Sequence, residues 1–216
     1  MRAGYPLSGL RFQENGQQAV FDRGSGLIWQ RSDSSGYSAG GYSGLLSWED
    51  AFRYVAALNA EQFAGYADWR LPNIKELVSI ANKGTWLPAV YSIFDGMLDA
   101  EYWSSTATSN ITAYYVLFSD GNVQNSETDT STRFYVKAVR SYLPGSGQIG
   151  FPTTGQSEVY HPAAGYDQGG DGVTQSGYPL TGASYQDNGN GTVTQIATGL
   201  IWQQKDSATQ SFGEYT

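Results

Sequence analysis

Short runs of alternating hydrophobic and polar residues predict β-strands near both ends of the first 142 residues. Turn-forming dipeptides separate these runs, notably Asn15-Gly16 and Asp120-Gly121, which favour tight hairpins. The predicted strands are residues 12–16, 20–22, 26–30, 101–106, 113–118 and 133–142. We expect them to form a mainly antiparallel sheet.

A helical period replaces this alternation between residues 47 and 84. Ser47 followed by Asp50 resembles a capping box, and apolar residues then recur at the spacing of one helix face. Asn73 with Glu76 three residues later predicts the start of a second helix. Two early helices beside a later run of strands indicate an α+β fold.

The opening segment of the chain is repeated near its end. At a fixed offset of 173 positions, 16 of the 31 residues over 4–34 are identical to those over 177–207, with no gap. The second copy reaches residue 216 before any counterpart of the helices. A lone hairpin is marginal in water, so its Leu200, Ile201 and Trp202 become candidate assembly residues.

Three interpretations of the second copy remain open. The chain is part of a longer tandem array, or the second copy pairs with a neighbouring subunit, or it is a frayed tail. Pairing between subunits would give a head-to-tail assembly, which forms a filament where the rotation does not close. We predict a complete domain over 1–143, a Gly-, Pro-, Ser- and Thr-rich linker or extended arm over 144–176, and a partial second copy of the N-terminal β-strands over 177–216.

Composition narrows the classes of function. The 216 residues carry 12 Lys and Arg against 20 Asp and Glu, a net charge of −8, which argues against nucleic acids and anionic membranes as partners. The absence of Cys excludes disulfides, thiolate metal sites and thiol nucleophiles. No apolar run is long enough to cross a membrane or resembles a signal peptide, so an exported chain would be a mature form. The Gly-, Ser-, Thr- and Tyr-rich composition is typical of a secreted surface protein, and we expect an extracellular or cell-surface location.

No catalytic constellation stands out, and we expect a non-enzymatic protein. The single His161 lies in the arm without a Ser or Asp at a triad spacing. A glycosidase pair such as Glu101 with Asp120 stays open, but nothing singles it out. Segments 187–191 and 167–172 place oxygen ligands at alternate positions, yet the full calcium-loop pattern is missing. We therefore expect no cofactor and no metal, with calcium as a minor alternative.

Six motifs in order carry a family resemblance. They are Gly-Leu-Ile-Trp-Gln (26–30), Ser-Trp-Glu-Asp-Ala (47–51), Asp-Trp-Arg-Leu-Pro-Asn-Ile-Lys-Glu-Leu (68–77), Tyr-Trp-Ser-Ser-Thr (102–106), Phe-Ser-Asp-Gly (118–121) and Ala-Val-Arg (138–140). In order and spacing they resemble the Legionella collagen-like protein C-terminal domain family, over about residues 10–142, and the opening motif recurs over 184–205. The resemblance implies a C-type-lectin-like unit with two helices, a sheet that joins the N- and C-terminal strands, and a long loop region that presents variable residues.

The same resemblance implies extracellular adhesion or ligand binding. Some members are similar to hypervariable targets of retroelement-driven diversification, and the domain of the name-giving member binds sulfated glycosaminoglycans as a trimer. This chain departs from that property, because a net charge of −8 leaves no obvious basic surface. The related formylglycine-generating enzymes depend on Cys, which this chain lacks, and the Glu-Pro-Asn calcium signature of lectins does not occur.

Residues expected to recognise a ligand are distinguished from residues expected to hold the fold. Polar loops flanked by tyrosines, over 104–112 and 124–133, have the chemistry of recognition surfaces. The candidate ligand-binding residues are Tyr102, Trp103, Tyr114, Tyr115, Asn125 and Tyr135. The residues expected to be structural are Trp29, Trp48, Trp69, Arg70, Pro72, Glu76 and Arg140. We expect Arg70 to pin the turn before the second helix through backbone carbonyl or Glu76 contacts.

Two hypotheses of function follow. The first is a non-enzymatic extracellular protein for adhesion or filament structure, whose partners are copies of itself in tandem or head to tail. The second is a discrete domain that binds a neutral glycan or a protein receptor without assembly. Neither involves nucleic acid or membrane insertion.

Overall fold

The computed structural model describes residues 10–94, 96–142, 151–160, 170–177, 185–196 and 199–204. The chain divides into two compact units, Met1–Tyr178 and Pro179–Thr216, and each is described by itself. The helices are α1 (Trp48–Ala60), the 3-10 helix η1 (Phe63–Gly65), α2 (Ile74–Ser79) and α3 (Asp171–Thr174), all in the first unit. The described residues of the arm, 151–160 and 170–176, thus belong to the first unit.

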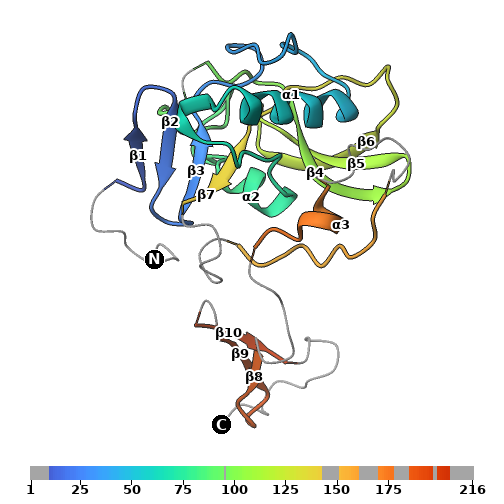
Figure 1. The fold of residues 1–216 in the computed structure, drawn as a ribbon. Helices are drawn as coiled ribbons and strands as arrows, with labels where there is room; N and C mark the ends of the chain where they lie inside the picture. Colours follow the sequence, from blue (N-terminus) through green and yellow to red (C-terminus); the bar gives the residue numbers. More distant parts are fainter. Residues whose placement is uncertain are drawn as a thin grey trace. The chain divides into compact units, whose positions relative to one another are not determined.

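Two antiparallel sheets form the framework of the first unit (Figure 1). One consists of β1 (Phe12–Asn15), β2 (Ala19–Asp22), β3 (Leu27–Gln30) and β7 (Val139–Ser141), in that order. The other consists of β4 (Glu101–Ser109), β5 (Thr112–Leu117) and β6 (Asn122–Glu127), joined by successive hairpins. Few helices and several antiparallel sheets confirm the α+β part of the fold prediction.

Both helix starts are held by the caps that the sequence predicts. The Ser47 side chain accepts a hydrogen bond from the amide of Asp50 over 3.2 Å, and Asn73 and Glu76 form a complete capping box at α2. Each satisfies backbone donors that a helix start leaves unpaired. The predicted apolar stripe of α1 is buried along its length: Trp48, Ala51, Phe52, Val55 and Leu58.

Both faces of β3 in the first unit are covered. In β3, Ile28 packs in the cluster that contains the α1 side chains, whereas Leu27 and Trp29 pack in a second cluster with Leu77 and Ile80. The strand alternates its side chains between two cores because successive residues point to opposite faces. β3 is therefore buried on both sides, and Figure 1 shows α1 and α2 beside its sheet.

The predicted strand over 133–142 is shorter in the structure. Only Val139–Ser141 forms a continuous ladder, with β3. Phe134 and Tyr135 make isolated bridges instead, to Leu46 and to Tyr102. This segment crosses from one sheet to the other, so its backbone bonds go to several partners and no single ladder can extend along it.

The second unit repeats the opening meander with the same register. Its strands are β8 (Tyr185–Asp187), β9 (Thr192–Gln195) and β10 (Leu200–Gln203), in the order β10-β9-β8. Val193 faces Trp202, as Val20 faces Trp29 in the first unit. The turn glycines also match, since Gly16 and Gly189 both have φ of 72°, a left-handed conformation that glycine tolerates best. The repeat in sequence is thus a repeat in structure.

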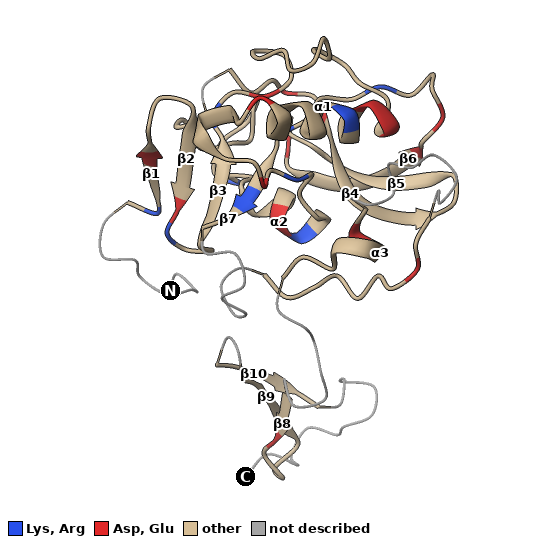
Figure 2. Cartoon of the chain, viewed as in Figure 1, with Lys and Arg blue, Asp and Glu red and all other residues tan. Residues whose placement is uncertain are grey.

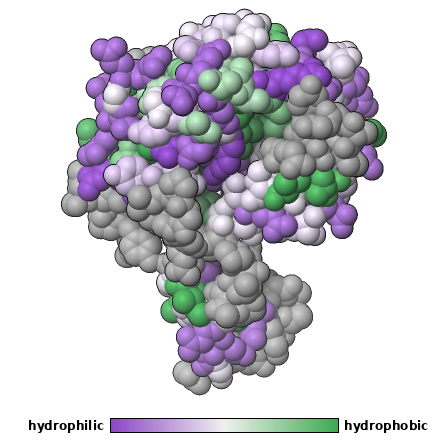
Figure 3. All heavy atoms as spheres, viewed as in Figure 1, coloured by the Kyte–Doolittle hydropathy of each residue, from purple (hydrophilic) through white to green (hydrophobic). Residues whose placement is uncertain are grey.

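The two copies differ in how far they are covered. In β3, Leu27 is 2% exposed and both Ile28 and Trp29 are 0% exposed. Their counterparts Leu200, Ile201 and Trp202 are 52%, 66% and 55% exposed. Figure 3 shows hydrophobic surface on this unit, and Figure 2 shows it almost without charge. Asp187 is the one charged residue within 185–196 and 199–204.

Candidate functional site beside the docked arm

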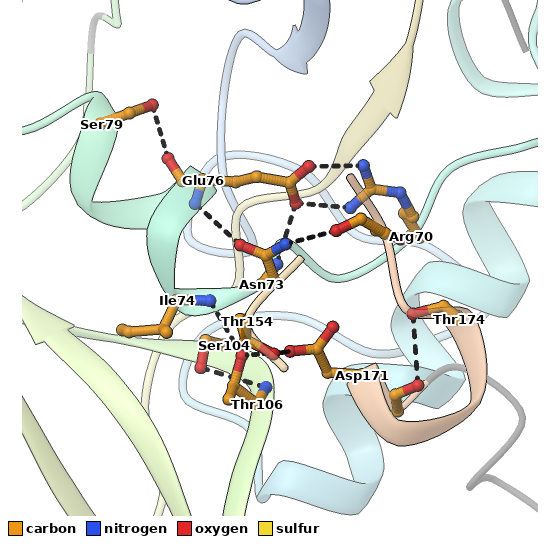
Figure 4. A network of polar contacts seen from close by, with 12 residues as sticks. Arg70, Asn73, Ile74, Glu76, Ser79, Ser104, Thr106, Thr154, Asp171 and Thr174 are labelled. Carbon is orange, nitrogen blue, oxygen red and sulfur yellow. Dashed lines mark hydrogen bonds and ion pairs between the residues drawn. The ribbon is translucent and has the colours of Figure 1, made fainter. Parts of the chain in front are cut away.

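A buried polar network organises the start of α2 (Figure 4). The Arg70 guanidinium forms two hydrogen bonds with the Glu76 carboxylate, at 2.6 and 2.7 Å. The same carboxylate accepts a hydrogen bond from the backbone amide of Asn73 over 3.0 Å. In return, Asn73 Oδ1 accepts a hydrogen bond from the backbone amide of Glu76 over 2.9 Å. Burial alone would lower the pKa of Arg70, but the charge and hydrogen bonds of Glu76 outweigh it and raise the pKa, so the guanidinium stays protonated.

One carboxylate joins the arm to this region. Asp171, at the start of α3, is 0% exposed, and its Oδ2 accepts hydrogen bonds from Thr106 Oγ1 at 2.8 Å and Thr154 Oγ1 at 2.5 Å. Among the described residues its Oδ1 has no hydrogen-bond partner. Burial raises the pKa of Asp171 above its ordinary value, although the two threonine hydrogen bonds oppose this. Asp171 therefore links α3, β4 and residue 154 of the arm.

Three more hydrogen bonds hold the arm against α2 and β4. The amide of Ala107 donates to Gln156 Oε1 over 2.9 Å, and Lys75 Nζ donates to the carbonyl of Thr153 over 2.7 Å. Asn73 Nδ2 donates to the carbonyl of Ser176 over 2.9 Å. The described arm residues are thus docked through specific contacts at several points, rather than extending away from the first unit.

A groove of about 620 Å³ lies between this arm, α2 and the β4–β6 sheet. This volume falls in the range typical of small-ligand sites. The residues that define its chemistry are Lys75, Thr108, Tyr114, Val123, Gln156 and Tyr160. The strands and α2 supply a fixed wall, and the docked arm supplies the opposite wall.

The sequence profile of the Lcl C-terminal domain family matches residues 18–140, from β2 to β7. The chain belongs to this family, the C-terminal domain of the Legionella collagen-like protein. A comparison with curated proteins gave no match. The family comes from a collagen-like surface protein, which indicates an extracellular location. Within the described ranges, no helix is both long and apolar enough to cross a bilayer.

Two predicted ligand-binding residues of this Lcl C-terminal domain lie together. Tyr114 lines the groove, and Asn125 is its cross-strand partner on β6. Directly paired residues of an antiparallel ladder project from the same face. Asn125 is exposed, and Tyr114 is partly exposed. Both stay candidates for recognition.

The prediction for Tyr102 and Trp103 is corrected, because both side chains are 0% exposed. The Tyr102 hydroxyl donates to Asp33 over 2.5 Å, and burial raises its pKa above the ordinary value. Trp103 Nε1 donates to the carbonyl of Leu46 over 2.9 Å. Neither ring has surface left for a ligand, because both faces of β4 are covered at this point by the two cores.

Tyr115 and Tyr135 are intermediate cases. Tyr115 packs on Phe134 with ring centroids 4.6 Å apart, and its hydroxyl donates to Gln124 over 2.8 Å. Tyr135 packs on the buried Tyr102 with centroids 5.5 Å apart. Both side chains are partly exposed, and neither of them lines the groove. They serve mainly as cover for the cores.

The residues expected to be structural make the contacts of a framework. The indoles of Trp29, Trp48 and Trp69 are at most 4% exposed. Arg140 pairs with Asp68 over 2.6 Å, and the carbonyl of Pro72 accepts from the amide of Ser105 over 2.8 Å. The Glu76 contact expected for Arg70 is present, as described above.

Sequence reasoning missed the arm as part of the site. Its Gly-, Pro-, Ser- and Thr-rich composition predicts a linker or an extended arm and gives no sign of docking, yet Thr154, Gln156 and Asp171 contact the domain. The one feature of the sequence that could have pointed to docking is the segment 167–172, which contains Asp171 and resembles an incomplete calcium loop. The structure describes only Gly170, Asp171 and Gly172 of this segment. Among the described residues, no three His, Cys, Asp or Glu side chains gather as metal ligands. His161 lies outside the described residues.

Proposed function

We propose that the protein is a non-enzymatic surface protein outside the cell that assembles head to tail, in adhesion or as part of a filament. The observation that carries this proposal is the contrast between the two meanders. Leu200, Ile201 and Trp202 occupy a strand with the register of β3, yet each is more than half exposed. A strand with apolar side chains on both faces is stabilised when both faces are buried, and a partner molecule could bury them.

The free energy available from such cover is substantial. Full burial of a large apolar side chain is worth roughly 1.5–3 kcal/mol. Leu200, Ile201 and Trp202 are between half and two-thirds exposed, so covering them would contribute about 3–5 kcal/mol before the costs of association. The near absence of charge on the described part of this unit keeps local repulsion low where another copy would contact it, although the whole chain carries a net charge of −8. A second copy of the same chain is the occupant that we propose.

The scaffold and its polar network support a binding or structural role. A sheet in which β7 closes the N-terminal meander supports the C-type-lectin-like architecture that we propose for the first unit. In the buried network, Arg70, Asn73 and Glu76 satisfy one another and the start of α2. Their hydrogen-bonding groups are used for folding, which favours a non-catalytic function.

The test is the oligomeric state of the full chain with matched point variants. Ile201 and Ile111 are both 66% exposed, one in the second unit and one between β4 and β5. Light scattering after size-exclusion chromatography, together with negative-stain imaging, should show oligomers for the wild type and Ile111→Glu and a shift to monomer for Ile201→Glu. A wild type that stays monomeric at high concentration, or an Ile201→Glu variant that assembles normally, contradicts the proposal.

A further inference from the structure

The groove beside the docked arm is a second surface with its own chemistry. It lies in the first unit and includes none of the residues that we propose for assembly. We propose that it binds a short neutral oligosaccharide. The inference stands on the groove alone and does not depend on assembly.

The charges around the groove favour an uncharged ligand. Lys75 and Glu158 are the charged residues that line it, one of each sign. Lys75 Nζ is already hydrogen bonded to the carbonyl of Thr153 over 2.7 Å. Binding of a sulfated or phosphorylated chain normally depends on several cations that neutralise its charges, and this lining has a single lysine.

The remaining lining pairs aromatic rings with hydroxyl and amide groups. Tyr114 comes from β5, and Tyr160 comes from the arm. A tyrosine ring offers a flat apolar face for the C–H side of a sugar ring, at low entropic cost, and a hydroxyl at its edge. Ser157 adds a hydroxyl that can bond a sugar hydroxyl. Thr108 and Gln156 already bond Thr112, Ala107 and Glu158, but a hydroxyl and a carboxamide each have further donor or acceptor positions. The combination of apolar faces and uncharged hydrogen-bonding groups matches a saccharide.

A peptide fits this region less well, because the neighbouring backbone is already hydrogen bonded. An extended peptide usually binds by adding a strand to an open sheet edge. β4 and β6 are the two edge strands of this sheet, and at β4, the edge beside the arm, the amides of Trp103, Ser105 and Ala107 donate to Tyr135, Pro72 and Gln156. The strand that carries Tyr114 lies in the middle of its sheet. Where the arm docks, the groove therefore presents side chains rather than an open backbone edge.

The arm makes the groove a conditional site. Gln156 and Tyr160 reach it only while the arm is docked, and Asp171 with Thr154 and Thr106 holds that docking. A domain whose arm has been released would keep Tyr114 but lose the opposite wall. Ligand binding and arm docking should therefore stabilise each other.

The experiment measures binding of defined sugars to the full chain by calorimetry and NMR titration. The probes are cellohexaose, xylohexaose, mannohexaose, maltohexaose and chitohexaose, with a heparin-derived hexasaccharide as the sulfated comparison. We expect at least one neutral hexasaccharide to bind. We expect Tyr114→Ala and Tyr160→Ala each to weaken it by about tenfold, the scale of one lost ring contact.

The control is Trp86→Ala, since Trp86 is 75% exposed and lies outside the groove lining. It should leave affinity unchanged. Absence of binding to all five neutral sugars at about 10 mM, far weaker than ordinary recognition, would overturn the proposal. So would binding of the sulfated probe alone, or neutral-sugar binding that survives both tyrosine substitutions. None of these outcomes changes the assembly state, so failure here leaves the proposed function to be judged by its own test.

Discussion

Removing the charge of Glu76 should destabilise the first unit severely. The Glu76 side chain is 1% exposed and neutralises Arg70, whose side chain is 17% exposed. Glu76→Gln keeps the size of the side chain, but it removes the carboxylate that is hydrogen bonded to the partly buried guanidinium, leaves only the weaker charges of Asp171 and Asp68 nearby, and weakens the capping box. Breaking a buried ion pair on one side typically costs about 3–5 kcal/mol. For a unit of this size, that cost corresponds to a fall of about 6–20 °C in Tm.

The matched control is Glu49→Gln. Glu49 also pairs with an arginine, Arg53, over 2.8 Å, but the two side chains are 36% and 30% exposed. Pairs of this kind contribute about 0.3–0.5 kcal/mol. Urea denaturation followed by near-UV circular dichroism gives both free energies of unfolding. If the Glu76→Gln variant lost less than about 1 kcal/mol, or no more than Glu49→Gln, the argument that this pair pins α2 would be refuted.

Two further predictions test the burial of named side chains. Trp103→Ala should lower the free energy of unfolding by about 3–5 kcal/mol, as expected for a buried aromatic, while Tyr114→Ala should cost about 1 kcal/mol or less; similar losses in urea melts would contradict the assignment of Trp103 to the core. For Asp171, burial raises the pKa in the folded state, so the docked arm is most stable below the ordinary pKa and loses stability as pH rises through the raised value. Hydrogen exchange at the Ala107 amide should therefore speed up with rising pH by more than the intrinsic pH dependence of exchange. Asp171→Asn should remove this additional acceleration. The same additional acceleration in the variant would contradict the role of Asp171.

The parts of the fold that depend on local chemistry could be predicted from the sequence. The caps at Ser47 and Asn73 act over three residues, so their motifs are sufficient to place both helix starts. The repeated meander is likewise local, and its turn glycines and apolar strands recur with the same register in both units. The motif Trp-Arg-Leu-Pro with Glu-Leu also carried the family assignment correctly.

The site depended on contacts between distant segments, and these have no local signal. Thr106 and Asp171 are 65 positions apart, and Ala107 and Gln156 are 49 apart, yet these pairs dock the arm. Nothing in a Gly- and Thr-rich segment distinguishes a docked arm from a free linker. The error on Tyr102 and Trp103 has the same origin, because a Tyr-Trp pair before a polar loop reads as recognition surface unless both faces of its strand are known to be covered.

The internal repeat separates what a strand sequence determines from what its surroundings determine. Leu-Ile-Trp-Gln folds as β3 and as β10 with the same pairing to the preceding strand, so the meander itself follows from local sequence. Its burial does not, since Ile28 is 0% exposed and Ile201 is 66% exposed. In the first unit, that cover comes from α1, α2 and the 134–141 segment, which lie far along the chain. The second meander therefore has the strand pattern of a core, but the apolar side chains of its last strand are half to two-thirds exposed, and burying them is the energetic reason for the association that we propose.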